Sequence, residues 1–136
     1  MKDHIRQYLE TDGEDGHIFQ GLPCLLLTTR GRKTGEPRQV AVIYGRHGTD
    51  YVIVASMGGS DVNPGWYKNL LAEPEAQIQV KADRMRVRAR TAGAEERAAL
   101  WDEMATIYPS YNDYQAATKR EIPISILEVV SSRNGS

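Results

Sequence analysis

The sequence predicts a mainly β fold of the α+β class: a small barrel of about six mostly antiparallel strands, with three to four short helices on its flank. Two observations lead to this prediction. Six short runs are either continuously apolar or alternate between polar and apolar residues, as strands do. The segments with helical periodicity are short and do not alternate regularly with those runs, which argues against a doubly wound sheet.

The N-terminal part predicts one short helix followed by three strands. Residues 3–11 place Ile5, Tyr8 and Leu9 on one helical face. The first strand is a continuous apolar run behind a proline, and the next two strands are joined by a tight turn at Gly48. These strands are expected over residues 23–29, 38–46 and 50–56.

The middle of the chain predicts a short helix and a hairpin. The helix, over residues 66–74, stops at Pro74 because the residue before a proline is pushed out of the helical region. Residues 76–93 alternate polar and apolar side chains on both sides of a turn, which is typical of a hairpin with one solvent-facing side. We interpret the alternating arginines of its second strand as a solvated face; they are Arg84, Arg86, Arg88 and Arg90.

The last third predicts two helices and a final strand over residues 122–130. The first helix, over residues 92–109, has acidic residues in its first turn, as the helix macrodipole favours. The second helix, over residues 110–119, has Ser110 as its expected N-cap. The core stripe of the first helix is expected to be Leu100, Trp101, Met104 and Ile107.

Length and composition predict one domain over residues 1–130 and a flexible tail over residues 131–136. The net charge of −1 argues against a nucleic-acid-binding protein. No apolar run approaches the ~20 residues of a membrane span, and the start is too charged for a signal peptide, so a cytoplasmic location is expected. The single cysteine, Cys24, is expected in the core, and the three histidines have no metal-ligand spacing, so no metal is predicted.

The stretch TTRGRKTGEPRQVAVIYG, residues 28–45, crowds basic residues around one turn. A plain hairpin does not need them, so we expect them to bind an anion: Arg offers a planar fork to phosphate or carboxylate, and Lys adds a point charge. Gly31 and Gly35 can take positive φ and turn backbone N–H groups toward a ligand. The alternative is a solvated hairpin tip. The basic residues are Arg30, Arg32, Lys33 and Arg38.

The stretch ASMGGSDVNPGWYKNL, residues 55–70, predicts a second binding element. Its glycines allow a ligand to approach the backbone closely. The helix that starts near Pro64 to Trp66 offers free N–H groups to an anion or to an electron-rich ring edge, and Trp66 can cover a flat aromatic ligand. The alternatives are a plain loop and a core tryptophan.

The stretch YPSYNDYQ, residues 108–115, spaces three tyrosines so that they would share one helical face. Three phenols on one face could line a pocket, donate hydrogen bonds or hand over a proton. The alternative is a packed aromatic ridge. The tyrosines are Tyr108, Tyr111 and Tyr114.

Three stretches, in this order, resemble the deazaflavin-dependent nitroreductase family, whose members are split β-barrels related to FMN-binding proteins and use coenzyme F420. The stretches are LLLTTRGRKTGEPR, then YVIVASMGGSDVNPGWYKNL, then YPSYNDYQ with REIPISILE. The resemblance covers about residues 22–128. Many relatives have Lys where this chain has Met57, which removes one cation near the coenzyme, and some have Pro in place of Ala41.

The resemblance implies a site for each part of this coenzyme, whose tail carries a phosphodiester and an oligoglutamate chain. It assigns the phosphate and tail to Arg32, Lys33, Thr34, Gly35 and Arg38. It assigns the deazaflavin ring and its linker to Ala55, Ser56, Met57, Gly58, Pro64, Trp66 and Asn69.

The resemblance also implies a reaction: hydride transfer from the reduced coenzyme to an electron-poor acceptor such as a quinone, an enone or a nitroaromatic. The expected catalytic residues, which would stabilise negative charge on the acceptor and supply a proton, are Ser56, Tyr108, Tyr111 and Tyr114. A separate dehydrogenase would re-reduce the coenzyme. A homodimer and a peripheral membrane contact through a quinone substrate are kept as options.

Two other readings stay open at this point. The first is an FMN-dependent reductase of the same fold, since one phosphate would also fit the basic turn. The second is a carrier that binds the coenzyme, or a lipid or haem analogue, without turnover. A nucleic-acid module using the arginine-rich strands is disfavoured by the net charge.

Overall fold

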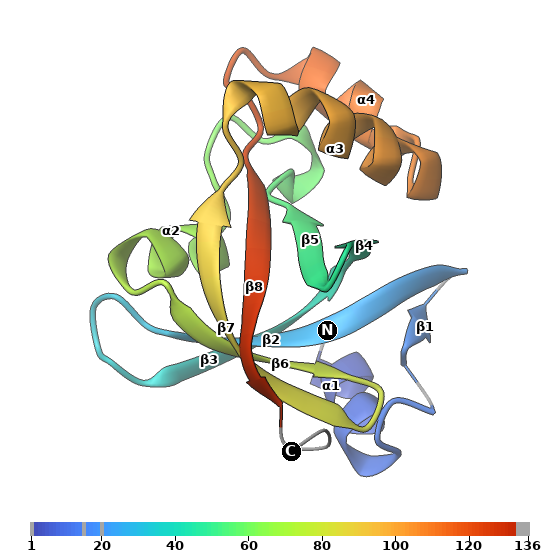
Figure 1. Cartoon of the computed structure of the whole chain (residues 1–136), viewed down its shortest axis with the longest axis vertical. Coiled ribbons are helices and arrows are strands. Elements are labelled where there is room, and N and C mark those ends of the chain that lie inside the picture. Colours follow the sequence, from blue (N-terminus) through green and yellow to red (C-terminus); the bar gives the residue numbers. More distant parts are fainter. Residues whose placement is uncertain (1, 15, 20, 133–136) are drawn as a thin grey trace.

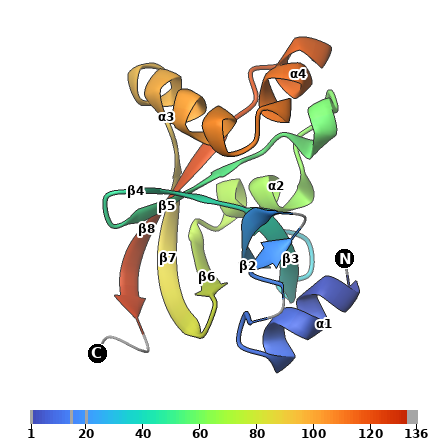
Figure 2. The ribbon, with the colours of Figure 1, turned by 90° about the vertical axis from the view of Figure 1, so that its right-hand side faces the viewer.

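The computed structural model of the chain describes residues 2–14, 16–19 and 21–132. A single curled sheet forms the body of the protein, with α3 and α4 at one end, α1 at the opposite end and α2 at the side (Figures 1 and 2). The helices are α1 (Lys2–Glu10), α2 (Gly65–Ala72), α3 (Ala94–Ile107), α4 (Ser110–Ala117) and the one-turn 3₁₀ helix η1 (Met57–Gly59). The strands are β1 (Ile18–Phe19), β2 (Leu22–Arg30), β3 (Pro37–Ile43), β4 (Gly45–His47), β5 (Asp50–Val54), β6 (Glu75–Val80), β7 (Asp83–Thr91) and β8 (Ile124–Ser132).

The strand order is β1-β2-β6-β7-β8-β5-β4, and β3 pairs with β2 outside this path. Every strand pairing in the described part of the chain is antiparallel. The predicted class, a mainly β split barrel with flanking helices, is therefore confirmed. No helix of the described residues is long and apolar enough to cross a membrane.

Three details of the predicted elements differ from the structure. The strand expected over residues 38–46 is interrupted at Tyr44, so that β3 pairs with β2 and β4 pairs with β5; β1 and β4 are short strands added to the six expected. Ser110 is not an N-cap: Pro109 takes that position, and Ser110 is the first residue of α4. Of the expected tail, Ser131 and Ser132 belong to β8, and residues 133–136 lie outside the described residues.

The core has two parts, and they divide the molecule along its length. The first fills the barrel, with Leu25, Ile78 and Leu127 among its members and α2 against its side. The second lies between the α3–α4 pair and the strands β5 and β8. Leu100 and Met104 are buried there and the other two residues of the expected stripe pack against them, which confirms the predicted core face of α3.

Candidate functional site

A groove of about 450 Å³ lies between the β2–β3 turn and the start of α2. It brings together two stretches that are more than twenty residues apart in the sequence and that were each expected to bind the coenzyme. The predicted residues that line it are Arg32, Lys33, Thr34, Arg38, Trp66 and Asn69, together with Thr29, Gly31, Gln39, Val40 and Gly65. Gly35 lines a neighbouring depression of about 360 Å³ on the other side of the turn.

The two glycines of the turn have different roles. Gly35 adopts φ +76°, as predicted, and its N–H donates to the carbonyl of Gly31 at 2.7 Å. Gly31 does not adopt positive φ, so that part of the prediction is wrong. A Cβ on Gly31 would lie 3.1 Å from Oγ1 of Thr34, and its N–H donates to the carbonyl of Glu36 at 2.8 Å. Because both glycine N–H groups are used inside the turn, anion binding falls mainly to side chains.

Asn69 of α2 fixes the basic turn to the body of the protein. Its Oδ1 accepts hydrogen bonds from the backbone N–H of Arg32 at 3.2 Å and from Nη1 of Arg32 at 2.9 Å. Its Nδ2 donates to Oγ1 of Thr29 at 3.1 Å. Asn69 is only 5% exposed and Thr29 only 1%. Asn69 therefore orients the Arg32 guanidinium at the groove, a role that its position in the sequence does not reveal.

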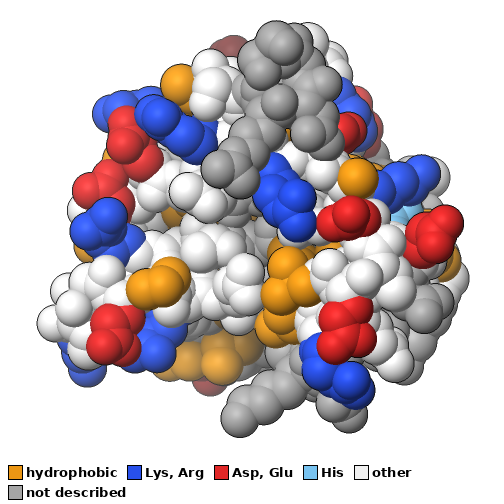
Figure 3. Space-filling model, turned by 90° about the horizontal axis from the view of Figure 1, so that it is seen from below, with side chains coloured by type: hydrophobic (Ala, Val, Ile, Leu, Met, Phe, Trp, Pro, Cys, Tyr) orange, Lys and Arg blue, Asp and Glu red, His pale blue; other side chains and the backbone are white. Residues whose placement is uncertain are grey.

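The groove carries positive charge that no acidic residue balances. In the described ranges, the groove cations Arg32, Lys33 and Arg38 have no carboxylate within 4.0 Å, and neither has Arg30 on the other side of the turn. Three of the four arginines of β7 do: the pairs are Arg84 with Asp12, Arg88 with Glu75, and Arg90 with Glu96 and Glu128. On the lower face of the molecule, basic side chains lie beside acidic ones (Figure 3). The turn is thus suited to an anion, because its cations would not have to break an ion pair to bind one.

Replacing Asn69 by Leu should weaken coenzyme binding without a direct loss of charge. Leu leaves the buried hydroxyl of Thr29 without its partner and releases Arg32, so we expect a loss of about 1–3 kcal/mol of stability. We also expect the dissociation constant for coenzyme F420 to rise about tenfold. Thermal unfolding and a fluorescence titration measure the two effects. An unchanged affinity in the folded variant would show that the Asn69–Arg32 contact does not organise the groove.

The loop after β5 leads directly into α2, whose first residues line the groove. The first residue of the loop, Ala55, is fully buried; its N–H donates to the carbonyl of Pro123 and its carbonyl accepts from Arg120, so Ala55 shapes the loop rather than offering a free group to a ligand. The Ser56 hydroxyl makes no hydrogen bond within the described part of the chain and is free to donate. Met57 is 54% exposed and Pro64 is buried.

The tyrosines form a cluster, but they come from two helices. Tyr108 directly follows α3 as its C-cap, and the other two belong to α4; the ring centroid of Tyr108 lies 5.0 Å from that of Tyr111 and 6.0 Å from that of Tyr114. The hydroxyls of Tyr108 and Tyr114 are 2.9 Å apart. Tyr111 is 4% exposed, and burial raises the pKa of its phenol. The hydrogen bond to Tyr108 is the main cause that raises the pKa of Tyr114, so Tyr111 and Tyr114 remain protonated at neutral pH.

The tyrosine cluster and the groove are separate features, joined through the loop. No tyrosine of the cluster lines the groove. However, α4 packs on the loop: a Cβ added to Gly59 would lie 3.0 Å from the carbonyl oxygen of Tyr114. The loop that is expected to meet the deazaflavin ring is therefore in contact with the helix that carries the phenols.

Arg120 was missed by the sequence reasoning. It lies between α4 and β8, and its guanidinium donates to the carbonyls of Ala55, Ser56 and Ser60 and to Oδ1 of Asn63. The only signal in the sequence was that Arg120 begins the stretch REIPISILE. Nothing local predicts a contact across about sixty positions.

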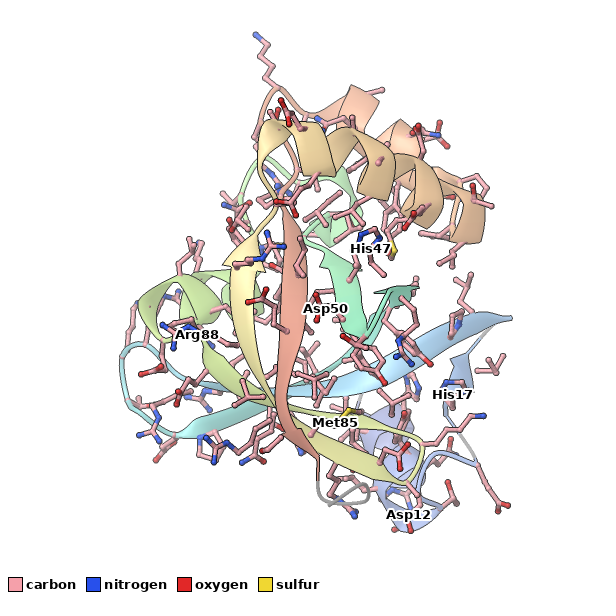
Figure 4. The ribbon with its side chains drawn as sticks, viewed as in Figure 1. Asp12, His17, His47, Asp50, Met85 and Arg88 are labelled. Atoms are coloured by element: carbon pink, nitrogen blue, oxygen red, sulfur yellow. The ribbon has the colours of Figure 1, made fainter. Side chains whose placement is uncertain are left out.

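The histidines do not form a metal site. His17 and His47 lie far apart in the fold (Figure 4), and the described residues contain no group of three His, Cys, Asp or Glu side chains that could hold a metal ion. Cys24 is buried, as predicted, and burial raises the pKa of its thiol to about 11, so it is no nucleophile at neutral pH.

Comparisons with known proteins give a consistent result. The model of the family described as F420H(2)-dependent quinone reductase matches residues 1–129. A protein of Mycobacterium tuberculosis named F420H(2)-dependent quinone reductase is 40% identical over 128 residues, which is 91% of this chain and 86% of that protein.

Two solved structures resemble the fold closely. An F420-H2 dependent reductase, FDR-A, has a TM-score of 0.73 at 36% identity and covers 78% of this chain and 94% of its own. A protein described as a domain-swapped dimer has a TM-score of 0.75 at 34% identity and covers 93% of this chain and 98% of its own. The chain belongs to the F420H(2)-dependent quinone reductase family, whose enzymes depend on reduced coenzyme F420.

Proposed function

We propose that this enzyme reduces a quinone with reduced coenzyme F420, and that enones and nitroaromatic compounds are further acceptors. The observation that carries the proposal is the groove in which the unpaired cations Lys33 and Arg38 and the positioned Arg32 lie beside Trp66. A ligand that fits must have an acidic part and a flat part. Coenzyme F420, the coenzyme of the family, has both.

Each part of the coenzyme has suitable residues in this chain. We assign the phosphate and tail to Arg32, Lys33, Thr34, Gly35 and Arg38, because Arg and Lys make charge-assisted hydrogen bonds to such groups. We assign the ring to the neighbourhood of Ser56, Met57, Gly58 and Trp66, with Ala55 and Pro64 shaping the loop from buried positions and Asn69 acting through Arg32. When bound, the reduced coenzyme supplies a hydride.

The protein's part in the chemistry is to supply a proton and to stabilise negative charge on the acceptor oxygen. The Tyr108–Tyr114 hydroxyl pair and the hydroxyl of Ser56 are the candidates, because each is an O–H group that can donate a hydrogen bond. Tyr111 is the weakest candidate, since its side chain is almost fully buried. We assign it mainly to packing between α4 and the strands below.

Single replacements by Phe at Tyr108 and Tyr114 should lower kcat by about a hundredfold if the pair donates the proton. Removing one hydroxyl leaves the other without its partner but preserves the ring packing. The measurement is the oxidation rate of the reduced coenzyme by a quinone. Tyr67→Phe is a matched control, because its hydroxyl contacts Thr91 rather than the loop, and it should retain the full rate. Full rates in both cluster variants would exclude these phenols as donors.

One experiment tests the proposed function as a whole. The purified protein is mixed under air-free conditions with reduced coenzyme F420 and menadione, and the absorbance of the coenzyme is followed. The proposal predicts multiple turnovers. Binding without turnover of any acceptor would support the carrier reading. Tight binding of FMN with no binding of coenzyme F420 would support the FMN-dependent reading.

The remaining parts of the proposal concern partners and location. A separate dehydrogenase re-reduces the coenzyme. The enzyme is cytoplasmic, and a quinone acceptor dissolved in a membrane would bring it into peripheral contact with that membrane. We keep the homodimer as part of the proposal, since a relative of 34% identity is described as a domain-swapped dimer. Sedimentation of the purified protein measures the oligomeric state.

A further inference from the structure

The loop that follows β5 has an unusual backbone shape at its start. Met57, Gly58 and Gly59 adopt φ values of +44°, +64° and +84°, so three consecutive residues are in the left-handed region. A non-glycine residue is disfavoured there, and Met57 points a largely exposed side chain away from the core. Two backbone hydrogen bonds within the loop hold part of this shape: the N–H of Gly59 donates to the carbonyl of Ser56, and that of Ser60 to the carbonyl of Met57.

The guanidinium of Arg120 binds both ends of this loop at once. At the start of the loop, Nη2 donates to the carbonyl of Ser56 at 2.9 Å and to that of Ala55 at 3.2 Å. Further along, Nε donates to the carbonyl of Ser60 at 2.7 Å, and Nη1 donates to Oδ1 of Asn63 at 2.8 Å. Only a planar fork with several fixed donors satisfies four such acceptors together.

Arg120 has no carboxylate within 4.0 Å in the part of the chain that the structure describes, so its charge is directed at carbonyl and amide oxygens. Carbonyl oxygens that accept from Arg120 point toward it. Met57 and Gly58, which lie between these acceptors in the sequence, are exposed and are the part of the loop that a ligand can reach.

The segment from Gln115 to Arg120 also joins the loop to α4, the helix that carries Tyr111 and Tyr114. The hydroxyl of Thr118, just after α4, donates to Oδ1 of Asp61 at 2.7 Å. Gln115 of α4 donates to the carbonyl of Arg120 at 2.8 Å, and Gly59 packs against the backbone of Tyr114. Loop, Arg120 and α4 form one connected unit.

We propose that Arg120 is a positioning residue for the reaction: it holds residues 55–63 in the shape that receives the deazaflavin ring and keeps that loop at a fixed place relative to the Tyr108–Tyr114 hydroxyl pair. This inference rests on the proposed function. It concerns the ring and not the acidic tail, which the basic turn holds.

The test separates the ring from the tail by using two ligands. The intact coenzyme is compared with its tail-free chromophore, 8-hydroxy-5-deazariboflavin, in fluorescence titrations of the Arg120→Ala and Arg120→Lys variants. We expect Arg120→Ala to weaken both ligands by the same factor, at least about tenfold, because both carry the ring. We expect Arg120→Lys to be intermediate, because a single ammonium cannot reach acceptors at both ends of the loop.

Arg97→Ala is the matched control. Arg97 also joins this region, since it donates to the carbonyl of Ile122 and to Gln115, but it makes no hydrogen bond to residues 55–63. It should lower the unfolding temperature and leave both affinities within about twofold. Added guanidinium ion should restore part of the coenzyme affinity and turnover of Arg120→Ala and should not affect Arg97→Ala.

Each outcome decides the matter. If folded Arg120→Ala binds the chromophore as tightly as the unchanged protein does, Arg120 does not position the ring loop. If Arg120→Ala does not fold, Arg120→Lys carries the same comparison, and an unchanged chromophore affinity there overturns the proposal. If the unchanged protein binds neither ligand, the proposed function itself fails, which is a different result.

Discussion

Replacing Arg32, Lys33 and Arg38 together by Gln should weaken the binding of coenzyme F420 by about a thousandfold. A hydrogen bond to a charged group contributes about 1.5–3 kcal/mol, and the loss of two or three such bonds gives this factor even when they are not fully additive. Two of these side chains have no carboxylate partner in the described residues, and the third is held at the groove by Asn69. A titration of the variant with the coenzyme measures the change.

The control for this triple variant removes equal charge at another place. Replacing Arg84, Arg88 and Arg90 by Gln lowers the net charge by the same amount, but these arginines are exposed and already paired with acidic residues. Exposed pairs contribute little, so stability and coenzyme affinity should change only slightly. If both triple variants lose affinity equally, the effect comes from the overall charge and not from a binding turn.

Gly13→Ala should be the most destabilising single replacement of a glycine outside the groove. Gly13 adopts φ +84°, and a Cβ there would lie 2.3 Å from Cα of Lys81, a backbone atom that cannot move aside. The left-handed conformation costs about 1–2 kcal/mol for Ala, and forced overpacking adds about 1–3 kcal/mol. We therefore expect a loss of about 3 kcal/mol or more in the free energy of unfolding, measured by urea denaturation.

The loss of stability expected for Gly13→Ala depends on how α1 is attached to the barrel. The hydroxyl of Tyr8 accepts from the N–H of Lys81 at 2.7 Å and donates to the carbonyl of Gln79 at 3.1 Å, and burial raises the pKa of this phenol to about 12. Gly13 lets the chain after α1 approach the same β6–β7 turn. Gly48→Ala is the control, because Gly48 has φ +62° but no atom within 4 Å of its Cβ position; it should cost only about 1 kcal/mol. Equal losses in the two variants would show that the contact with Lys81 is unimportant.

The sequence predicted those parts of the fold that depend on local pattern. The six main strands, the helices and the core face of α3 follow from periodicity, and the resulting class is confirmed. The basic turn could be predicted as a binding element because a plain hairpin turn does not need a cluster of arginine and lysine residues. The break at Tyr44 was not visible, since the run from Arg38 to Arg46 is apolar enough for one strand, and the change of partner from β2 to β5 is decided by tertiary packing.

The features that complete the site join positions far apart in the chain. The Asn69–Arg32 contact spans 37 positions, and the contact of Arg120 with Ser60 spans 60. Each contact depends on how two elements are placed relative to one another, and periodicity and composition do not predict that placement. Gly31 shows the same limit on a small scale: its purpose is close packing with Thr34 rather than positive φ.

The central claim is that unpaired cations of the β2–β3 turn hold the acidic tail of the coenzyme while the ring is held elsewhere. The most direct measurement is the affinity of the unchanged protein for the intact coenzyme and for its tail-free chromophore as the salt concentration rises. The account predicts that salt weakens binding of the intact coenzyme steeply, because exposed charges are screened, and leaves the chromophore almost unaffected. Equal salt dependence for the two ligands would contradict it.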